Sequence, residues 1–202
     1  MTDDAKKIEL LNTHRAYDGF FKIDQLTFRH TLFEGGWSPE IKRELFGRGE
    51  AVIVLLYDLK AEMVVLIEQC RAGALQHAAL KNHQAWLIEP VAGMVETGES
   101  NLVACKREAF EEAGVTHAEF EYICQFYPSP GGSDEILYLY AAEVDSEALP
   151  DYAGEASEVE DIRLIKMPFS QAKSKLMKAE FNVASTIIAL QWLLFQKIEK
   201  SC

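Results

Sequence analysis

The most marked hydrophobic pattern in the chain is a pair of continuous apolar runs, at 51–57 and 63–67, separated by the polar residues 58–62. Short apolar runs without alternation are typical of strands buried on both faces, and the polar break predicts a hairpin between them. Strands are also predicted at 8–47 (a set of short strands that includes 20–30 and 41–46, with a turn at Gly35-Gly36), 86–91, 119–127, 136–144 and 162–167.

Helical periodicity follows in three segments. The segment 100–114 begins at Ser100, a good N-cap residue, and ends at Gly114, a good stop residue. Segment 170–178 is amphipathic, and 183–198 carries its large apolar side chains on one broad face. The order of strands, one helix, more strands and then helices predicts an α/β or α+β fold, with a sheet core and helices outside.

Composition narrows the class of partner. The 202 residues suit one main domain with a small appendage, and the net charge of −12 argues against nucleic acid or an acidic membrane as a partner. No leader peptide and no apolar stretch near the ~18 residues of a membrane helix is recognised. The four cysteines form no Cys-x-x-Cys pair, so we expect reduced thiols and a cytoplasmic protein.

Acidic residues gather at helical spacing within the segment 93–115. Glu108, Glu111 and Glu112 stand at i, i+3 and i+4, which places their side chains ~5–6 Å apart. Such like charges repel one another and destabilise a helix. A bound Mg²⁺ makes their proximity favourable, because it prefers carboxylate, phosphate and water oxygens as ligands. A solvated acidic face is the alternative for three glutamates taken alone. An apolar face for packing on a sheet is expected from Leu102, Cys105, Ala109 and Ala113.

The whole segment resembles the Nudix box, Gly-x5-Glu-x7-Arg-Glu-U-x-Glu-Glu-x-Gly-U, where U is a bulky apolar residue. All seven fixed positions are present: Gly93, Glu99, Arg107, Glu108, Glu111, Glu112 and Gly114. Ala109 is smaller than usual for a U position. If each residue type appears about one time in fifteen, a chance match is on the order of 10⁻⁸ per starting position. The resemblance implies a Nudix α/β/α sandwich with a mixed sheet, and hydrolysis of a nucleoside diphosphate linked to another moiety.

Similarity to the bacterial ADP-ribose pyrophosphatases of this family extends beyond the box, to the stretches 19–21, 43–44, 67–71, 89–94, 129–132, 158–162 and 188–192. Pro130 lies sixteen residues after Gly114, a separation associated in the family with ADP-ribose hydrolysis. Simple turn chemistry is the alternative for this proline. The resemblance implies cleavage of ADP-ribose to AMP and ribose 5-phosphate by water attack on a metal-bound pyrophosphate, with two or three Mg²⁺ ions per site and Mn²⁺ as a substitute.

The resemblance also assigns roles to residues. It implies metal binding by the carboxylates of Glu108, Glu112 and Glu160 and the carbonyl of Ala92, and a catalytic base at Glu158, with support from Arg107 and Glu111. It implies substrate contacts by Phe20, Phe21, Arg43, Glu44, Arg71, Met94, Ser129, Pro130, Gly131 and Glu135. A mobile acidic loop is the alternative for Glu158 and Glu160. Core packing is the alternative for one of the two phenylalanines, because neighbours in a strand point to opposite faces.

Two domains are expected. Residues 1–48 would form a small N-terminal antiparallel β-sheet domain used in dimerisation, and 49–202 the Nudix hydrolase domain, in a homodimer with a shared active site. One alternative is a Nudix hydrolase of another nucleotide sugar, such as GDP-mannose. Another is a non-catalytic nucleotide-binding sensor, although such proteins usually have degraded boxes.

Overall fold

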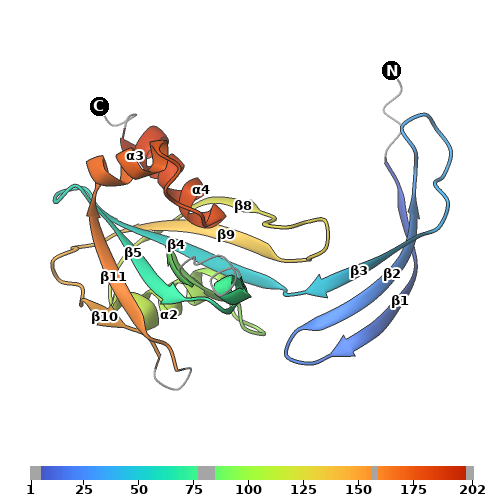
Figure 1. Cartoon of the computed structure of the whole chain (residues 1–202), viewed down its shortest axis with the longest axis horizontal. Coiled ribbons are helices and arrows are strands. Elements are labelled where there is room, and N and C mark those ends of the chain that lie inside the picture. Colours follow the sequence, from blue (N-terminus) through green and yellow to red (C-terminus); the bar gives the residue numbers. More distant parts are fainter. Residues whose placement is uncertain (1–5, 77–84, 156–158, 199–202) are drawn as a thin grey trace. The chain divides into compact units, whose positions relative to one another are not determined.

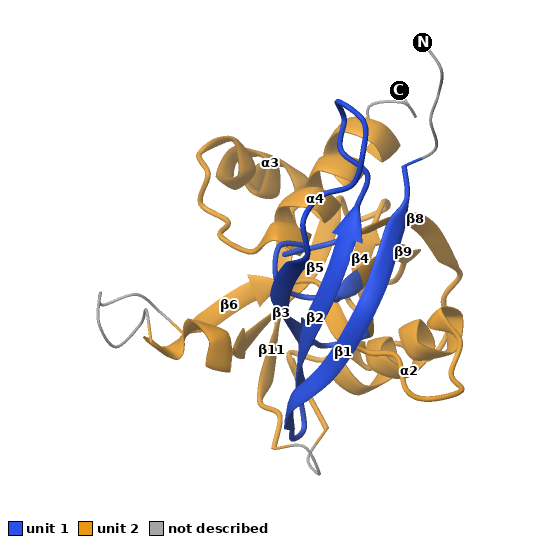
Figure 2. Ribbon diagram, turned by 90° about the vertical axis from the view of Figure 1, so that its right-hand side faces the viewer, with its two compact units in different colours: residues 1–49, 127–136 blue, residues 50–126, 137–202 orange. Residues whose placement is uncertain are grey.

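The computed structural model of the chain describes residues 6–76, 85–155 and 159–198. It divides into two compact units, residues 1–49 with 127–136 and residues 50–126 with 137–202 (Figure 2). The short segment 127–136 therefore groups with the N-terminal residues, although it lies far along the chain from them. The hydrophobic pattern does not indicate this grouping.

The first unit is built on a three-stranded antiparallel sheet in the order β1 (Ile8–Asp18), β2 (Lys22–His30) and β3 (Ile41–Gly47) (Figure 1). The end of β3 holds the segment 127–136, because the Phe46 N–H donates to the Gly132 carbonyl at 2.7 Å and the Asp134 N–H donates to the Phe46 carbonyl at 3.2 Å. The small antiparallel sheet expected from the sequence is thus present.

The second strand starts later than predicted. It begins at Lys22, whereas Phe20 and Phe21 lie in the turn after β1. The turn is closed by the Gly19 N–H, which donates to the Phe21 carbonyl at 3.1 Å. Strand alternation therefore does not apply to the two phenylalanines, and the prediction of a strand from residue 20 was wrong by two residues.

The second unit contains an eight-stranded sheet, counted over the residues that the structure describes. Its main path runs β10 (Tyr152–Ala153), β11 (Ile162–Pro168), β5 (Met63–Cys70), β4 (Glu50–Asp58), β9 (Ile136–Glu143) and β8 (Phe120–Phe126). The predicted hairpin is confirmed as the antiparallel pair β4 and β5. The strand predicted at 86–91 is interrupted at Pro90, which has no N–H to donate. Consequently β6 (Trp86–Glu89) pairs with β5, while β7 (Val91–Met94) pairs with β4.

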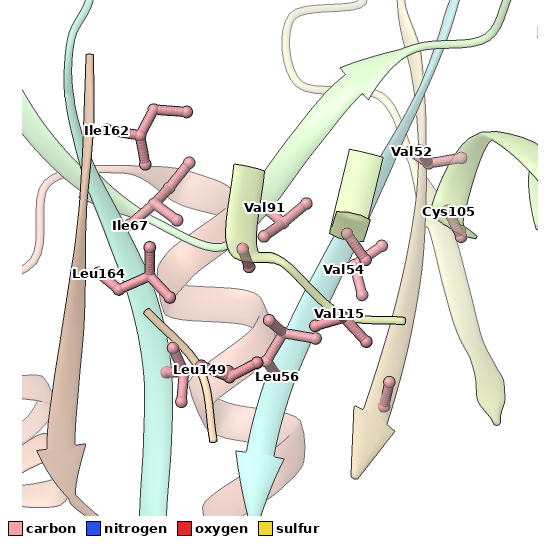
Figure 3. Close-up of a cluster of buried hydrophobic side chains, with 14 of the residues drawn as sticks. Val52, Val54, Leu56, Ile67, Val91, Cys105, Val115, Leu149, Ile162 and Leu164 are labelled. Atoms are coloured by element: carbon pink, nitrogen blue, oxygen red, sulfur yellow. The ribbon is translucent and has the colours of Figure 1, made fainter. Parts of the chain in front are cut away.

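The sequence of strand β4 is apolar without alternation because both faces of the strand are covered. Val52, Val54 and Leu56 belong to one buried cluster, which includes the small side chains of helix α2 (Asn101–Ala113) (Figure 3). Ile53 and Leu55 belong to a second cluster on the opposite face. Each face of the sheet therefore buries its own apolar core, which is the principal source of stability for such a layered fold.

The opposite face is covered by α3 (Phe169–Met177), α4 (Ala184–Trp192) and the π-helical turn η3 (Leu193–Ile198) (Figure 1). A 3₁₀ turn, η1 (Ala72–Ala74), follows β5. The helix predicted at 183–198 is thus regular only to Trp192. Helices on both faces of a sheet confirm the α+β class and the α/β/α sandwich. Among the described residues, no helix has the length and apolarity required to cross a membrane.

Candidate active site

Both ends of helix α2 have the caps that the sequence predicts. The Ser100 hydroxyl accepts a hydrogen bond from the Val103 N–H at 3.4 Å. At the other end Gly114 adopts the left-handed conformation, with φ of +70°. The Gly114 N–H donates to the Phe110 carbonyl, which is the bond of the αL capping motif, and the Val115 N–H donates to the Ala109 carbonyl. These caps fix where the acidic residues of the helix stand.

The buried face of α2 is wider than predicted, since Cys105, Ala109 and Ala113 are buried as expected and a second column is buried as well. Glu108 and Glu112 are not on a solvated face, because they are only 8% and 1% exposed. They follow Ala104 at four-residue steps, and this column lies beside the buried column Cys105, Ala109 and Ala113. Leu102, expected to pack on the sheet, is exposed instead. Small side chains let the helix approach the sheet closely, and the approach carries the two glutamates inward with it.

The position of the Glu108 side chain requires a glycine at residue 93 in strand β7. A Cβ atom added at residue 93 would lie 1.7 Å from Glu108 Oε1 and 1.9 Å from its Cδ. The two glycines of this segment, Gly93 and Gly98, have different roles. Gly98 does adopt a positive φ of +85°, whereas Gly93 provides room for a carboxylate against the strand.

Arg107 organises the acidic segment from its edge. Its guanidinium donates to both carboxylate oxygens of Glu99, at 3.1 and 3.0 Å, and to the Met94 carbonyl at 2.9 Å. It also donates to Glu108 Oε1 at 2.6 Å and forms an ion pair with Glu111, at 3.2 Å. The hydrogen bond from Arg107 lowers the pKa of Glu99. The Arg107 guanidinium thus links the loop before α2 to two glutamates of the helix.

Glu112 is the most deeply buried acid of the site. Burial raises the pKa of its carboxyl to about 8, and the neighbouring carboxylates Glu160 and Glu108 act in the same direction. The Ala92 N–H, which donates to Glu112 Oε2 at 2.9 Å, and the Arg71 charge oppose this rise. Burial also raises the pKa of Glu108, against the effect of Arg107. Ionising both glutamates therefore costs free energy unless additional positive charge approaches them.

Two residues that the sequence did not predict for the site, Glu89 and Gln69, contact residues that it did predict. Glu89 of β6 is 8% exposed and forms an ion pair with Arg71, which holds this arginine beside the acidic cluster. Gln69 of β5 is also 8% exposed, and its amide Nε2 donates to Glu160 Oε1 at 3.1 Å. Gln69 and Glu89 fall in the stretches 67–71 and 89–94, but the sequence gives no signal that they face the site rather than the core.

The donor set suits a divalent cation. Within the residues 6–76, 85–155 and 159–198, no three His, Cys, Asp or Glu side chains form a preformed metal cage. Glu108 accepts from Arg107 and Glu112 accepts from Ala92, so each carboxylate has an alternative partner. Buried oxygen donors, with pKa values raised by burial and by one another, are nevertheless the environment that a hard cation such as Mg²⁺ stabilises. The residues fit a cation that displaces existing hydrogen bonds.

The substrate-binding residues predicted in the first unit are grouped around β3 and the segment 127–136. The Phe21 ring lies 4.8 Å from the Phe20 ring and 5.0 Å from the Phe46 ring. Arg48 stacks on Phe21, 4.8 Å from its centroid, and forms an ion pair with Glu135 at 2.8 Å. Phe20 is 85% exposed. Of the two, Phe20 is therefore the ring that is free to stack on a ligand.

The other predicted residues are placed as follows. Arg43 and Glu44 lie in the middle of β3, opposite Leu26 and Gln25 of β2, and both are exposed. Ser129, Pro130 and Gly131 are exposed in the segment 127–136. Met94 ends β7 beside Arg107. The predicted base, Glu158, lies outside the described residues, so its role stays a prediction.

Comparison with known proteins agrees with this geometry. The NUDIX domain matches residues 47–187. An ADP-ribose pyrophosphatase of Escherichia coli (strain K12) is 39% identical over 186 residues, which cover 92% of this chain and 87% of that protein. A GDP-mannose pyrophosphatase of Escherichia coli (strain SMS-3-5 / SECEC) is 32% identical over 189 residues, covering 94% and 96%. A crystal structure of an ADP compounds hydrolase superposes with a TM-score of 0.67 at 19% identity, covering 96% of this chain and 95% of that one.

Proposed function

The chain belongs to the Nudix family, and we propose that it is a divalent-metal-dependent pyrophosphatase that hydrolyses ADP-ribose to AMP and ribose 5-phosphate. The observation that carries this proposal is the pair of buried carboxylates Glu108 and Glu112, with the half-buried Glu160 near them. The raised pKa values of Glu108 and Glu112 show that positive charge would stabilise their ionised forms. A pyrophosphate substrate would add its own negative charge to the site and would increase the need for a cation.

Mg²⁺, with Mn²⁺ as a substitute and two or three ions per site, would neutralise the phosphate charge and make a bound water more acidic. Glu108, Glu112, Glu160 and the carbonyl of Ala92 would hold these ions. Arg107, with Glu111, would keep Glu108 oriented while it exchanges one hydrogen bond for a cation. Glu158 would remove the proton from the attacking water, an effect that typically contributes ~10²–10⁴-fold. Arg71, held by Glu89, would contact the substrate.

ADP-ribose is preferred over GDP-mannose on sequence similarity. The ADP-ribose pyrophosphatase is 39% identical to this chain and the GDP-mannose pyrophosphatase 32%. Phe20, Phe21, Arg43, Glu44, Met94, Ser129, Pro130, Gly131 and Glu135 would complete the nucleotide pocket. The exposed Phe20 ring would stack on adenine. Base stacking tolerates any base, so the choice of base would depend on polar contacts such as those of Glu135.

We also propose a homodimer in which the first unit of each copy contributes to its partner's site. Strand β1 supports this proposal, because its large apolar side chains Ile8, Leu10 and Tyr17 are all exposed within the first unit. Phe33, in the turn after β2, is 95% exposed. Exposed apolar residues in this number mark an interaction surface. A fully active monomer in sedimentation velocity would contradict the shared site.

We also propose a cytoplasmic location. Cys70, Cys105 and Cys124 are all free thiols, and disulfides are rare in the cytosol. Fractionation of cells that express the full chain, with the protein detected by antibody, would test the location.

The reaction is best tested by ³¹P NMR of ADP-ribose incubated with the full chain. With Mg²⁺ we expect the two pyrophosphate signals to be replaced by the monophosphate signals of AMP and ribose 5-phosphate. EDTA in place of Mg²⁺ should stop the change, and so should Glu112→Gln at unchanged circular dichroism. Turnover in EDTA at the rate seen with Mg²⁺ would refute the role of the metal.

A further inference from the structure

Gln69 has an unusual environment for a residue of strand β5. It is 8% exposed, and alternation along the strand puts it on the same face as Val65 and Ile67, which belong to the core against α2. An apolar residue would suit this place equally well by packing alone. A buried amide there costs free energy unless both of its polar atoms find partners.

The two ends of the Gln69 amide differ. Nε2 donates to Glu160 Oε1 at 3.1 Å, whereas Oε1 has no hydrogen-bond partner among the described residues although it is buried. The nitrogen must be the atom that faces Glu160, because an oxygen in its place would repel the carboxylate. The unpartnered oxygen lies at the other end of the amide, buried and without a donor among the described residues.

Glu160 has few other restraints on its side chain. The Glu155 N–H donates to Glu160 Oε2 at a long distance of 3.4 Å, and this contact comes from the same loop. The Glu160 N–H returns to the Glu155 carbonyl at 3.3 Å. Among the described residues, Gln69 makes the one hydrogen bond to this carboxylate from outside its own loop. Gln69 thus ties a loop side chain to a central part of the sheet.

The chemical nature of Gln69 also suits an acidic site. A lysine or arginine at residue 69 would neutralise Glu160 and compete with a metal cation. An aspartate or glutamate would add repulsion to a cluster that already holds Glu108 and Glu112. A neutral amide donor fixes the carboxylate and leaves its charge available.

We propose that Gln69 is a positioning residue for the metal site, an inference that rests on the proposed function. Its Nε2–H holds the Glu160 carboxylate in place near Glu108 and Glu112. Residues of this kind, which orient a ligand without touching the metal, typically change metal affinity or activity by ~10–100-fold when they are removed.

The test is a double-mutant cycle on cation affinity, with Mn²⁺ binding to the full chain measured by EPR of the free ion. Gln69→Met, which keeps the side-chain length, should weaken Mn²⁺ binding by about tenfold or more. In a Glu160→Ala background the same change should have little further effect, because the positioned carboxylate is gone. Gln125→Met, on the exposed side of β8, is the matched control and should bind Mn²⁺ as the wild type does. If Gln69→Met does not fold, Gln69→Leu replaces it with the same expectation.

Kinetics provides a second readout. We expect Gln69→Met to lose activity at low Mg²⁺ and to regain much of it at high Mg²⁺, with KM for ADP-ribose changed by less than about threefold. Unchanged Mn²⁺ affinity would overturn the positioning role, as would a tenfold loss that persists in the Glu160→Ala background. The proposed function fails separately, if the wild type itself neither binds Mn²⁺ nor hydrolyses ADP-ribose.

Discussion

Replacement of Glu112 by glutamine should remove a pH dependence from the stability of the metal-free protein. Glu112 is 1% exposed, and burial raises its pKa from 4.5 to about 8. The folded chain therefore holds this proton more tightly than the unfolded chain does. The stabilising contribution is complete below pH 4.5 and is lost as the pH rises through about 8. Glutamine cannot ionise, but its carbonyl still accepts the hydrogen bond from the Ala92 N–H.

The magnitude follows from the width of this interval. Between a pKa of 4.5 and one of about 8, at about 1.4 kcal/mol per unit, the contribution amounts to roughly 4–5 kcal/mol. That is a large part of the stability of an ordinary domain. Only a fraction of the interval lies between pH 5.5 and 7.5, where the expected loss is roughly 2–3 kcal/mol.

The assay is urea unfolding in EDTA at pH 5.5, 6.5, 7.5 and 8.5, followed by circular dichroism. The free energy of unfolding of wild type minus that of Glu112→Gln should fall steadily with pH. The exposed Glu147→Gln is the matched control, and it should differ from wild type by less than about 0.5 kcal/mol at every pH. A difference between wild type and Glu112→Gln that is constant across this range would refute the burial argument. Added Mg²⁺ should stabilise the wild type increasingly as the pH rises, because it binds the ionised carboxylate.

Three further substitutions test other parts of the site. Gly93→Ala should reduce kcat for ADP-ribose on the order of 100-fold with little change in circular dichroism, because its Cβ would displace the Glu108 carboxylate. Glu89→Gln should raise KM for ADP-ribose by about tenfold, because Arg71 loses its charged partner. Phe20→Ala should raise KM about 5–160-fold, the equivalent of ~1–3 kcal/mol of stacking, and should leave the melting temperature unchanged.

Each of these has its own control. Gly73→Ala, where an added Cβ meets nothing within 4 Å, should keep full activity, and equal losses for both glycine variants would remove the role given to Gly93. Glu62→Gln is the control for Glu89→Gln, and the Arg71 argument is wrong if KM stays at the wild-type value. Phe21→Ala should lower the melting temperature, because Phe21 packs on Phe46, so a loss of stability in Phe20→Ala instead would reverse the assignment.

Periodicity and capping predicted much of the second unit correctly. The β4 and β5 hairpin and the caps of α2 follow from short local patterns, which is why the sequence alone indicates them. The width of the buried face of α2 was the main error, because Cys105, Ala109 and Ala113 are buried as predicted but a second column is buried beside them. Alanine is only weakly apolar, so the column through Ala104 gave no sign that it would be buried and would carry Glu108 and Glu112 inward.

Contacts between distant segments were the other part that the sequence could not indicate. Gln69 and Glu89 meet the acidic cluster through the antiparallel pairing of β5 with β6 and through the loop before β11. Similarly, the segment 127–136 reaches β3 through backbone hydrogen bonds at Phe46, which leave no trace in side-chain pattern. Resemblance to the family supplied the expected roles, whereas the positioning residues emerged only from the packing.

The central claim, that this Nudix chain is an ADP-ribose pyrophosphatase, is tested most directly by its specificity constants. We would measure kcat/KM for ADP-ribose and GDP-mannose side by side, at saturating Mg²⁺ and with the products identified. We expect a value for ADP-ribose that is at least about tenfold higher, with AMP and ribose 5-phosphate as products. A higher value for GDP-mannose would contradict the substrate assignment, and no hydrolysis of either would contradict the proposed activity.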